Sequence, residues 1–459
     1  MHYDLLVIGG GPAGYVGAIR AAQLGKRVAC LEKERAGGTC LNWGCIPTKS
    51  LLRNAELYHL MKHRAGDFGI KIDGLSYDWK KVISRSRDVS DKNAAGVEFL
   101  FKKNKVDYVR GEAFLNQPGE VVAKLADGKI ETHAAGKILI ATGVVSRPLP
   151  GLSFNGKTVI GSREAMILEP QPKSMVIIGA GAIGVEFAYF YNAFGTSVTL
   201  IEMLPNVLPV EDTEVSQTLE KSLTKQGIKI LTGTKTTKTE TTAQSVRVTV
   251  EGKSSETIEA DVCLVAIGVV PLLPRGELKF ELTERGYIKT DDRYQTSAKD
   301  VYAAGDIIGP PWLAHVASWE AIQAVDGMFD QTEPRKIREF PGCTYCQPQV
   351  ASIGLTERAA RESGKKFRIG KFPFSASGKA RAIGETEGFV KLIVGEPHGE
   401  ILGAHIIGPE ATEMIAELGL AITLEATYEE IEATIHAHPT LSESVHEAAG
   451  QAFGHAIHI

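Results

Sequence analysis

One pattern occurs twice in this chain, and it constrains the fold more than any other feature. Its first copy begins with the apolar run 4–8, which predicts a buried strand. The turn Gly9-Gly-Gly-Pro-Ala-Gly14 follows, then a helical pattern to Gly25, then the strand 27–31, which ends at Glu32. This order is typical of a dinucleotide-binding unit, since the glycines let a pyrophosphate approach the backbone at a helix N-terminus. Glu32 can accept hydrogen bonds from ribose hydroxyls.

The second copy has the same parts at a constant offset. The run 175–178 leads into Gly179-Ala-Gly-Ala-Ile-Gly184, a helix, and a strand that ends at Glu202. Gly9 and Gly179 are 170 positions apart, and so are Glu32 and Glu202. A single Gly-x-Gly-x-x-Gly is weak evidence, but two copies with matching strands and acids indicate two dinucleotide sites rather than a purely structural duplication.

The rest of the chain completes an α/β architecture, because 459 residues are too many for one ordinary core. We expect two Rossmann-like dinucleotide-binding domains, followed by a C-terminal α+β domain. The expected boundaries are 1–150, 151–270, 271–340 and 341–459. In the third segment, Ala303-Ala-Gly-Asp306 follows a strand-like pair and brings a carboxylate to a strand end. The last segment has no glycine-rich phosphate loop, so we expect it to serve something other than cofactor binding.

Charge and hydropathy exclude several kinds of partner. The net charge of −4 gives no electrostatic reason to expect nucleic acid or an acidic membrane surface. The stretch 175–195 is apolar over about the length of a membrane span, but it contains Glu186 and several glycines. It therefore predicts a strand, a turn and a helix, and no membrane segment. Tyr3–Ile8 already predicts a strand, with no targeting signal before it, so we expect a cytoplasmic protein.

Among the six cysteines, Cys40 and Cys45 form the pair that points to chemistry. Pro47 suits the first turn of a helix, so Cys45 would lie at a helix N-terminus, where the dipole favours a thiolate. Lys49 is one turn further along the same face, and Gly44 allows Cys40 to come close. The alternatives are two buried thiols, a zinc half-site and a structural disulfide. A redox-active pair explains the glycines and the helix start better than any of these.

The other cysteines carry less information. Cys30 and Cys263 lie in apolar strand-like runs and are most simply core residues. Cys343 and Cys346 could be redox-active or half of a zinc site, but they have no complementary pair elsewhere, so we interpret them as structural. We expect no metal site.

A histidine and a buried glutamate are further candidates. Histidine exchanges a proton near neutral pH, and His438 precedes Pro439, with Glu443 in position to orient the ring. We favour His438 over its neighbour His436 as the catalytic base. Glu186 lies in a helix that is apolar on nearly every side, so it needs a partner unless it reaches solvent at a domain edge.

Taken together, these motifs resemble the pyridine nucleotide–disulfide oxidoreductase family. Gly-Gly-Thr-Cys40-x4-Cys45-x-Pro, just after a dinucleotide motif, carries the resemblance. Within that family the segments 343–354, 374–385 and 436–443 are similar to those of dihydrolipoamide dehydrogenases. The similarity extends over essentially the whole chain.

The resemblance implies roles for individual residues. FAD would bind the first motif and NAD the second. Cys45 would face the flavin, Cys40 would exchange disulfides with substrate, and Lys49 would pair with Glu186. Residues from about 341 would form the dimerisation domain of a homodimer and supply His438 to the partner's active site. Residues implied for FAD are Gly9, Gly11, Pro12, Ala13, Gly14, Glu32, Lys33, Gly38, Thr39, Lys49, Gly111, Ala141, Thr142, Gly143, Asp306, Ala314 and His315. Those implied for NAD are Gly179, Gly181, Ile183, Gly184, Glu186, Glu202 and Gly268.

The implied reaction is oxidation of dihydrolipoamide to lipoamide with reduction of NAD to NADH. The implied partners are the lipoyl domains of a 2-oxo acid dehydrogenase complex or of the glycine cleavage system. A glutathione-type reductase would carry arginines where Glu202-Met-Leu-Pro stands, and a mercuric-type reductase would need a C-terminal cysteine pair. A non-catalytic scaffold subunit would not need Cys40, Cys45 and His438. One departure is Gly268-Val-Val-Pro, since many relatives carry an arginine shortly after this glycine.

Overall fold

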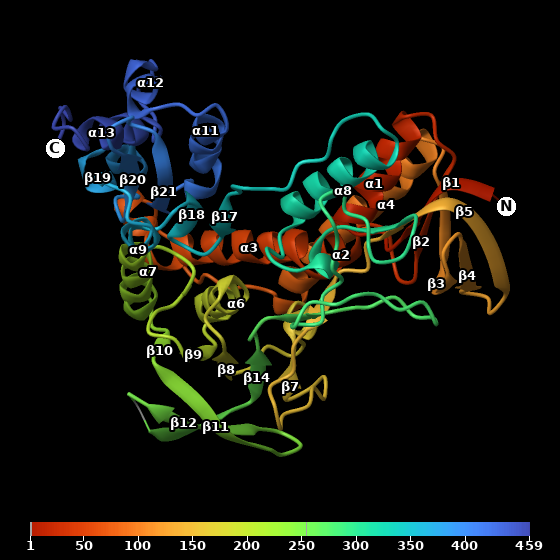
Figure 1. The fold of residues 1–459 in the computed structure, drawn as a ribbon. Helices are drawn as coiled ribbons and strands as arrows, with labels where there is room; N and C mark the ends of the chain where they lie inside the picture. Colours follow the sequence, from red (N-terminus) through yellow and green to blue (C-terminus); the bar gives the residue numbers. More distant parts are fainter. Residues whose placement is uncertain (1, 254) are drawn as a thin grey trace. The chain divides into compact units, whose positions relative to one another are not determined.

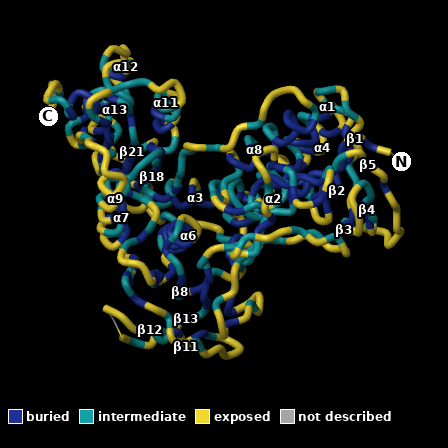
Figure 2. The backbone as a smooth tube through the Cα atoms, viewed as in Figure 1, coloured by how far each residue is buried: buried dark blue, intermediate teal, exposed yellow. Residues whose placement is uncertain are grey.

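The computed structural model describes residues 2–253 and 255–459, and its contacts divide the chain into two units (Figure 1). The first unit comprises Met1–Leu51, Asp78–Arg147 and Gly268–Arg338, and the second comprises Leu52–Tyr77, Pro148–Ile267 and Glu339–Ile459. The helix α3 (Cys45–His63) begins in the first unit and ends in the second. In both units the buried residues concentrate in the central strands (Figure 2).

The first unit is built on a parallel sheet in the order β3-β2-β1-β5-β16. Its strands are β1 (His2–Ile8), β2 (Val28–Glu32), β3 (Asp107–Gln117), β5 (Ile130–Ile140) and β16 (Val301–Ala303). β4 (Glu120–Leu125) pairs antiparallel with the outer ends of β3 and β5. A short antiparallel pair, β6 (Val144–Ser146) with β15 (Val269–Pro271), lies beyond β5. This strand order is the one a dinucleotide-binding fold requires.

Helices cover the first sheet. They are α1 (Pro12–Gln23), α2 (Gly38–Trp43), α4 (Trp79–Lys103), α8 (Ala314–Met328) and the short η2 (Asp306–Ile308). Gly17 lets α1 approach the sheet closely, because a Cβ there would lie 2.8 Å from Leu139 Cδ2 and 3.4 Å from Ala321 Cβ. The glycine thus allows α1 to pack on β5 and α8 together.

The second unit repeats this plan. Its parallel sheet runs β10-β9-β8-β14-β7, so β8, β9 and β10 occupy the places of β1, β2 and β3. The strands are β7 (Val159–Ile160), β8 (Ser174–Ile178), β9 (Ser197–Ile201), β10 (Lys229–Leu231) and β14 (Val262–Val265). An antiparallel sheet of β11 (Thr234–Thr241), β12 (Val246–Gly252) and β13 (Glu256–Ala260) follows. The helices are α5 (Ser162–Ala165), α6 (Ala182–Ala193), α7 (Thr213–Lys225) and η1 (Ala65–Phe68).

The C-terminal part of the second unit is an antiparallel sheet in the order β17-β18-β21-β20-β19. Its strands are β17 (Gly342–Thr344), β18 (Gln349–Gly354), β19 (Phe367–Pro373), β20 (Phe389–Gly395) and β21 (Ile401–Gly408). Its helices are α9 (Glu357–Glu362), η3 (Phe374–Ala376), α10 (Gly378–Ile383), α11 (Ala411–Thr423), α12 (Tyr428–Ala433) and α13 (Glu443–Gln451). Phe372, Leu392 and Val445 are among the buried residues of its core. The predicted fold class is confirmed. Within the described ranges, no helix is long and apolar enough to cross a membrane.

Candidate functional site

The first glycine turn is shaped by two close approaches of the backbone. Gly9 has φ +103°, and a Cβ there would overlap the carbonyl oxygen of Ala141. A Cβ on Gly14 would overlap Gly9 O. Gly11 is the N-cap of α1 and provides no side-chain cap, with Pro12 and Ala13 in the first turn. Only glycine fits at Gly9 and Gly14, and the helix N-terminus carries backbone donors without a cap.

The second turn has the same geometry. Gly179 has φ +102° and approaches the carbonyl oxygen of Ala266, and a Cβ on Gly184 would overlap Gly179 O. Gly181 is the N-cap of α6, with φ −71° against −72° at Gly11. The repeat in the sequence is therefore a repeat of backbone structure.

The glutamate at the end of the second strand of each repeat accepts a hydrogen bond from the backbone of its turn. Glu32 Oε2 accepts from Gly10 N at 2.7 Å, and Glu202 Oε2 accepts from Ala180 N at 2.8 Å. The other oxygen of each carboxylate accepts a backbone N–H two residues further on, at 2.7 and 2.8 Å. Both acids are buried. Each oxygen keeps a second lone pair, so the carboxylates can still accept from ribose hydroxyls.

The turns have room for a dinucleotide. A Cβ on Gly181 would meet no atom within 4 Å, and one on Gly11 would meet only Gly38 Cα at 3.8 Å. Uncapped backbone donors with open space before them are what a pyrophosphate requires. The residues therefore fit FAD at the first turn and NAD at the second, as the resemblance implied. Ile183, in the first turn of α6, is 43% exposed and offers an apolar surface there.

In the first unit, a buried carboxyl lies beside the first turn. A Cβ on Gly305 would lie 3.0 Å from Ala13 Cβ and 3.1 Å from Ala317 Cβ, so the end of β16 meets the starts of α1 and α8. Burial, followed by the charge of Glu320, raises the pKa of the adjacent Asp306 to about 6. A carboxyl held in this way needs a hydrogen-bond donor, which the ribityl chain of FAD would supply.

Other predicted FAD residues lie in the same unit. Thr142 Oγ1 is buried and, within the described ranges, has no hydrogen-bond partner. Gly111 stands where β3 leaves β2 and turns to pair with β4, one residue after the pair Glu32–Arg110. Ala314 and His315 begin α8, whose N-cap provides no side-chain bond. Lys33 is exposed after Glu32, and Thr39 lies in α2. Gly143, with positive φ, precedes β6. Gly268, which was predicted for NAD, also has positive φ and lies in this unit, before β15.

Cys40 and Cys45 are brought together at the end of α2. Cys45 is the first residue of α3, and Cys40 is hydrogen-bonded to it through the side chains. Gly44 makes this possible, because a Cβ there would lie 3.0 Å from Thr39 O and 3.4 Å from Cys40 Cα. The hydrogen bond to Cys45, then burial and the negative charge of Cys45, raise the pKa of the Cys40 thiol, while the charge of Lys49 lowers it in part. In the reduced pair, the Cys40 thiol therefore keeps its proton.

Glu186 has a partner that the sequence did not reveal. It is buried in α6, and its Oε1 accepts from Tyr345 N at 3.0 Å, from the turn after β17. The predicted pairing of Glu186 with Lys49 stays a prediction. Tyr345 lies between the second pair of cysteines. Cys346 is fully buried and donates to Pro348 O, as a structural thiol would.

The two candidate histidines differ in environment. His436 is buried at its side chain and bonded through both nitrogens, to Glu417 Oε1 at 2.7 Å and to Thr434 O at 3.0 Å. His438 has an 80% exposed side chain, and its Nδ1 lies 2.9 Å from Glu443 Oε1. Partial burial raises the pKa of Glu443, but bonds from Thr440 N and His438 outweigh it, so the pKa is lowered. Glu443 is therefore an anion placed to accept a hydrogen bond from Nδ1, an arrangement that leaves Nε2 available to accept a proton.

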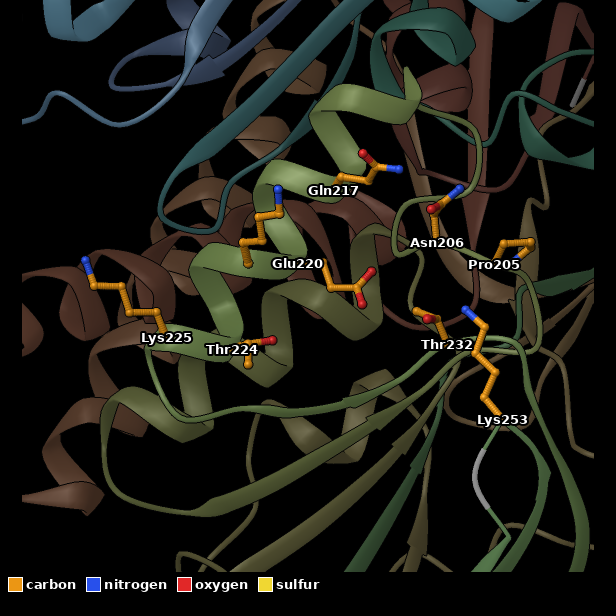
Figure 3. Close-up of a pocket in the computed structure, with 9 residues that line it drawn as sticks. Pro205, Asn206, Gln217, Glu220, Thr224, Lys225, Thr232 and Lys253 are labelled. Atoms are coloured by element: carbon orange, nitrogen blue, oxygen red, sulfur yellow. The ribbon is translucent and has the colours of Figure 1, made fainter.

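A pocket of about 580 Å³, lined mostly by polar and charged residues, was not anticipated from the sequence (Figure 3). It includes residues that follow Glu202 closely in the chain. Its lining residues are Pro205, Asn206, Gln217, Glu220, Lys221, Thr224, Lys225, Thr232 and Lys253. Lys221 and Lys253 are distant from Glu202 in the sequence, so only the fold shows that cations stand near this segment.

Comparisons with known proteins identify the family. Residues 3–321 match the model described as pyridine nucleotide-disulphide oxidoreductase, and residues 340–449 match the dimerisation domain of the same family. The chain belongs to the pyridine nucleotide–disulfide oxidoreductase family.

Individual relatives and solved structures show which members of this family the chain is similar to. The chain is 46% identical to dihydrolipoyl dehydrogenase of Chlorobaculum parvum, over 98% of this chain and 96% of the relative. It is 44% identical to that of Rhizobium etli, over 99% of both chains. The crystal structure of LpdA from Mycobacterium tuberculosis matches with a TM-score of 0.90 and 26% identity, covering 97% of this chain and 99% of that one.

These findings confirm the predicted resemblance to dihydrolipoamide dehydrogenases. The protein is an oxidoreductase of a flavoprotein family, and the expectation of FAD and NAD as its cofactors is confirmed. The C-terminal segment carries a dimerisation domain.

Proposed function

We propose that the protein is a dihydrolipoyl dehydrogenase, which oxidises protein-bound dihydrolipoamide to lipoamide and reduces NAD to NADH. The observation that carries the proposal is the Cys40–Cys45 pair, placed at a helix start and directly after a turn that fits FAD. The names of the relatives at 44–46% identity support this substrate over glutathione or mercuric ion.

The chemistry begins with the Cys40–Cys45 disulfide. His438 takes a proton from one thiol of dihydrolipoamide, and Glu443 stabilises the imidazolium that forms. The substrate thiolate attacks Cys40 Sγ and displaces Cys45 as a thiolate. The second substrate thiol then attacks its own mixed disulfide, which releases lipoamide and leaves the proton on Cys40. Two electrons have now moved from the substrate to the cysteine pair.

The residues of the two turns complete the route. Gly9, Gly11 and Gly14 would hold the FAD pyrophosphate, and Asp306 and Glu32 would hold its ribityl chain and ribose. When bound there, FAD supplies the two-electron carrier between the cysteine pair and the nicotinamide. Lys49 places a positive charge near the thiols. Gly179, Gly181 and Glu202 would hold NAD, and the overall products are lipoamide, NADH and one proton.

The protein would act as a homodimer in the cytoplasm, with His438 of the partner subunit completing each site. The dimerisation domain supports this arrangement. His438 also supports it, because the exposed ring and its oriented Nε2 are available to a second chain. Its partners would be lipoyl domains of a 2-oxo acid dehydrogenase complex or of the glycine cleavage system.

A substrate comparison tests the proposal. The purified flavoprotein is assayed with dihydrolipoamide and NAD, with NADPH and glutathione disulfide, and with NADPH and mercuric ion. We expect rapid NADH formation in the first assay and little turnover in the others. Faster turnover of glutathione disulfide or mercuric ion would overturn the substrate assignment, and a flavin-loaded protein inactive in all three assays would be a scaffold.

A further inference from the structure

The segment 203–212 connects the NAD turn with a buried ion cluster. It follows Glu202, whose carboxylate accepts a hydrogen bond from Ala180 N. It returns to the same turn at Leu208, whose N–H donates to Ala180 O at 2.8 Å. Leu208 O in turn accepts from Glu211 N at 2.9 Å and from Ser216 Oγ at 3.2 Å. Ala180 is therefore held on both sides, by Glu202 and by Leu208. The position of Leu208 depends on where the segment ends, at Asp212.

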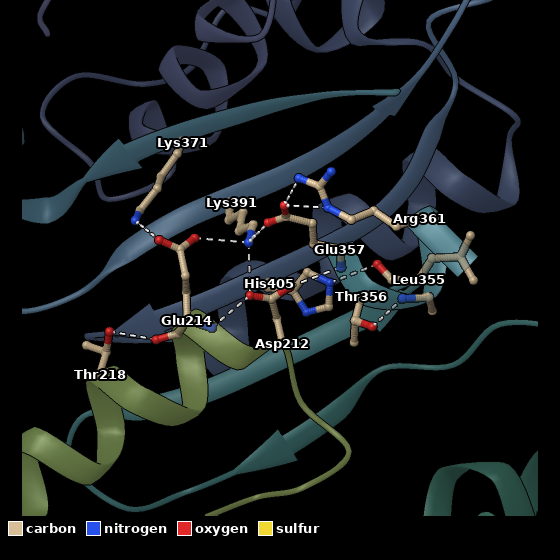
Figure 4. A network of polar contacts seen from close by, with 11 residues as sticks. Asp212, Glu214, Thr218, Leu355, Thr356, Glu357, Arg361, Lys371, Lys391 and His405 are labelled. Atoms are coloured by element: carbon tan, nitrogen blue, oxygen red, sulfur yellow. Dashed lines mark hydrogen bonds and ion pairs between the residues drawn. The ribbon is translucent and has the colours of Figure 1, made fainter. Parts of the chain in front are cut away.

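Asp212 is fixed by residues of the C-terminal sheet. Its Oδ1 accepts from Lys391 Nζ at 2.9 Å and from Glu214 N at 3.1 Å, where it caps α7. Its Oδ2 accepts from Glu357 N at 3.0 Å, at the start of α9. Figure 4 shows Lys391 of β20 pointing toward the carboxylates of Asp212, Glu214 and Glu357. The Asp212 carboxylate thus joins the nucleotide-binding part of the second unit to its C-terminal part.

Lys391 is fully buried, which is unusual for a lysine. It also contacts Glu357 Oε2 at 2.7 Å and Glu214 Oε2 at 3.0 Å. A buried ion pair gains little net stability over apolar residues of similar size, because both charges lose their water. An apolar residue would suit the strand sequence Phe-Val-Lys-Leu-Ile-Val-Gly better, so stability alone does not explain the lysine. Directed contacts, by contrast, fix the position of the group they hold.

We propose that Lys391 is a positioning residue for NAD binding. From the C-terminal sheet, it fixes the position of the segment 203–212 and, through Leu208, the position of the glycine turn at Ala180. The contacts run from Lys391 to Asp212, along the segment to Leu208, and from Leu208 to Ala180. The inference rests on the proposed binding of NAD at the second turn. It predicts that nucleotide affinity depends on a residue that touches no part of the nucleotide.

The neighbouring strand provides a matched control. Lys371 of β19 stands directly opposite Lys391 in the register of the sheet. It also pairs with Glu214, at 2.6 Å, but its side chain is 37% exposed and it makes no contact with Asp212 within the described ranges. The same substitution at Lys371 removes a lysine and an ion pair from the same cluster while the anchor of the segment remains.

The test measures nucleotide binding directly. ADP-ribose has the adenosine, pyrophosphate and second ribose of NAD but exchanges no hydride, and its Kd for the flavin-loaded enzyme is obtained by calorimetry. We expect Lys391→Met to raise this Kd about tenfold and Lys371→Met to change it less than about twofold. Lys391→Arg, which keeps the charge, should stay within about threefold of the parent. The KM for NAD should rise with Lys391→Met, while the KM for dihydrolipoamide stays constant.

Each outcome of the binding measurements either supports or overturns a part of the proposal. A folded Lys391→Met protein with a lower Tm but an unchanged Kd would show that the cluster is only structural. An equal rise in Kd for Lys371→Met would likewise overturn the proposal. If Lys391→Met does not fold, Asp212→Asn replaces it, with an expected rise of about threefold and refutation if the Kd is unchanged. A parent protein that binds no ADP-ribose would instead contradict the NAD site of the proposed function.

Discussion

The two glycine turns have nearly the same backbone, yet they differ in what surrounds them. Both turns accept a backbone N–H from a later segment at 2.8 Å, from Gly37 at Gly10 O and from Leu208 at Ala180 O. Only at the first turn does a further residue come close: Gly38, with φ +56°, lies so near that a Cβ on it would be 2.5 Å from Gly11 Cα. At the second turn, a Cβ on Gly181 would meet nothing. One turn is covered by its own chain, and the other is open.

This difference matches two kinds of cofactor use. The loop that covers the first turn continues directly into α2 and Cys40, so a dinucleotide held there is enclosed beside the thiols. The second turn is bordered by exposed apolar side chains, with Met203 63% exposed, and a Cβ on Gly181 would meet no atom within 4 Å. The difference suits the proposed function, in which a cofactor would stay bound at the first turn and a nucleotide would exchange at the second.

The largest expected effect is a loss of turnover when a cysteine of the first unit is replaced, without a change in nucleotide binding at the second unit. Cys45→Ser and Cys40→Ser should each lower turnover by about a thousandfold or more, because the pair acts as a unit, while ADP-ribose binding stays constant. Cys40→Ser should show an absorbance beyond the flavin bands without reductant, because Cys45 is then an unpaired thiolate beside the flavin. Cys45→Ser should show none. The assignment fails if the absorption spectra of the two variants are exchanged.

The second prediction concerns the choice of nucleotide at the open turn. Glu202 would accept from the ribose hydroxyls of NAD but repel the 2′-phosphate of NADP, so kcat/KM should favour NAD by roughly a hundredfold. Glu202→Gln should reduce that ratio. Lys253 in the adjacent pocket is a cation able to weaken the repulsion, so Lys253→Ala should increase the preference for NAD. Equal efficiency with both nucleotides in the parent would contradict this reading of Glu202.

A third prediction concerns pH and the segment next to the open turn. Burial raises the pKa of Glu211 to about 7, and its Oε2 has no hydrogen-bond partner in the described ranges. The folded protein therefore binds more protons than the unfolded chain between about pH 4.5 and pH 7, and its stability falls as the pH rises through that window. The loss is roughly 3 kcal/mol at most. Urea titrations at pH 5 and pH 8 should show this loss in the parent and not in Glu211→Gln.

The covered turn gives a smaller effect. Gly38→Ala places a side chain at φ +56° and against Gly11, and should cost about 1–2 kcal/mol. The flavin-to-protein absorbance ratio and the Tm should both fall. Gly181→Ala meets no protein atom, so it should keep both values and weaken only ADP-ribose binding. Equal losses of flavin in the two variants would remove the distinction between a covered and an open turn.

The last prediction tests whether the thiols and the base come from different chains. Cys45→Ala and His438→Gln should each be nearly inactive alone, and the two variants are co-expressed in equal amounts. Random pairing makes about half of the dimers mixed, and each mixed dimer has one intact site, so about a quarter of all sites should be active. If the mass confirms mixed dimers but the activity does not rise above that of the single variants, both residues of each site come from one chain.

The sequence by itself determined the parts that depend on local geometry. Gly14 and Gly184 are required by approaches to Gly9 O and Gly179 O within their own turns, and the start of α3 at Cys45 follows from Pro47 in its first turn. Backbone sterics act over a few residues, so a spacing of residue types was enough to predict these elements and, with the repeat, the fold class.

Only the tertiary structure decided which distant residues complete them. The bond from Tyr345 N to Glu186, the bond between His436 and Glu417, and the ion cluster at Asp212 all join segments separated by many residues. One signal was present, since Lys391 interrupts an otherwise apolar strand. The identity of its partners was not, because a buried charge requires a counter-charge and the fold alone determines which carboxylates come within reach.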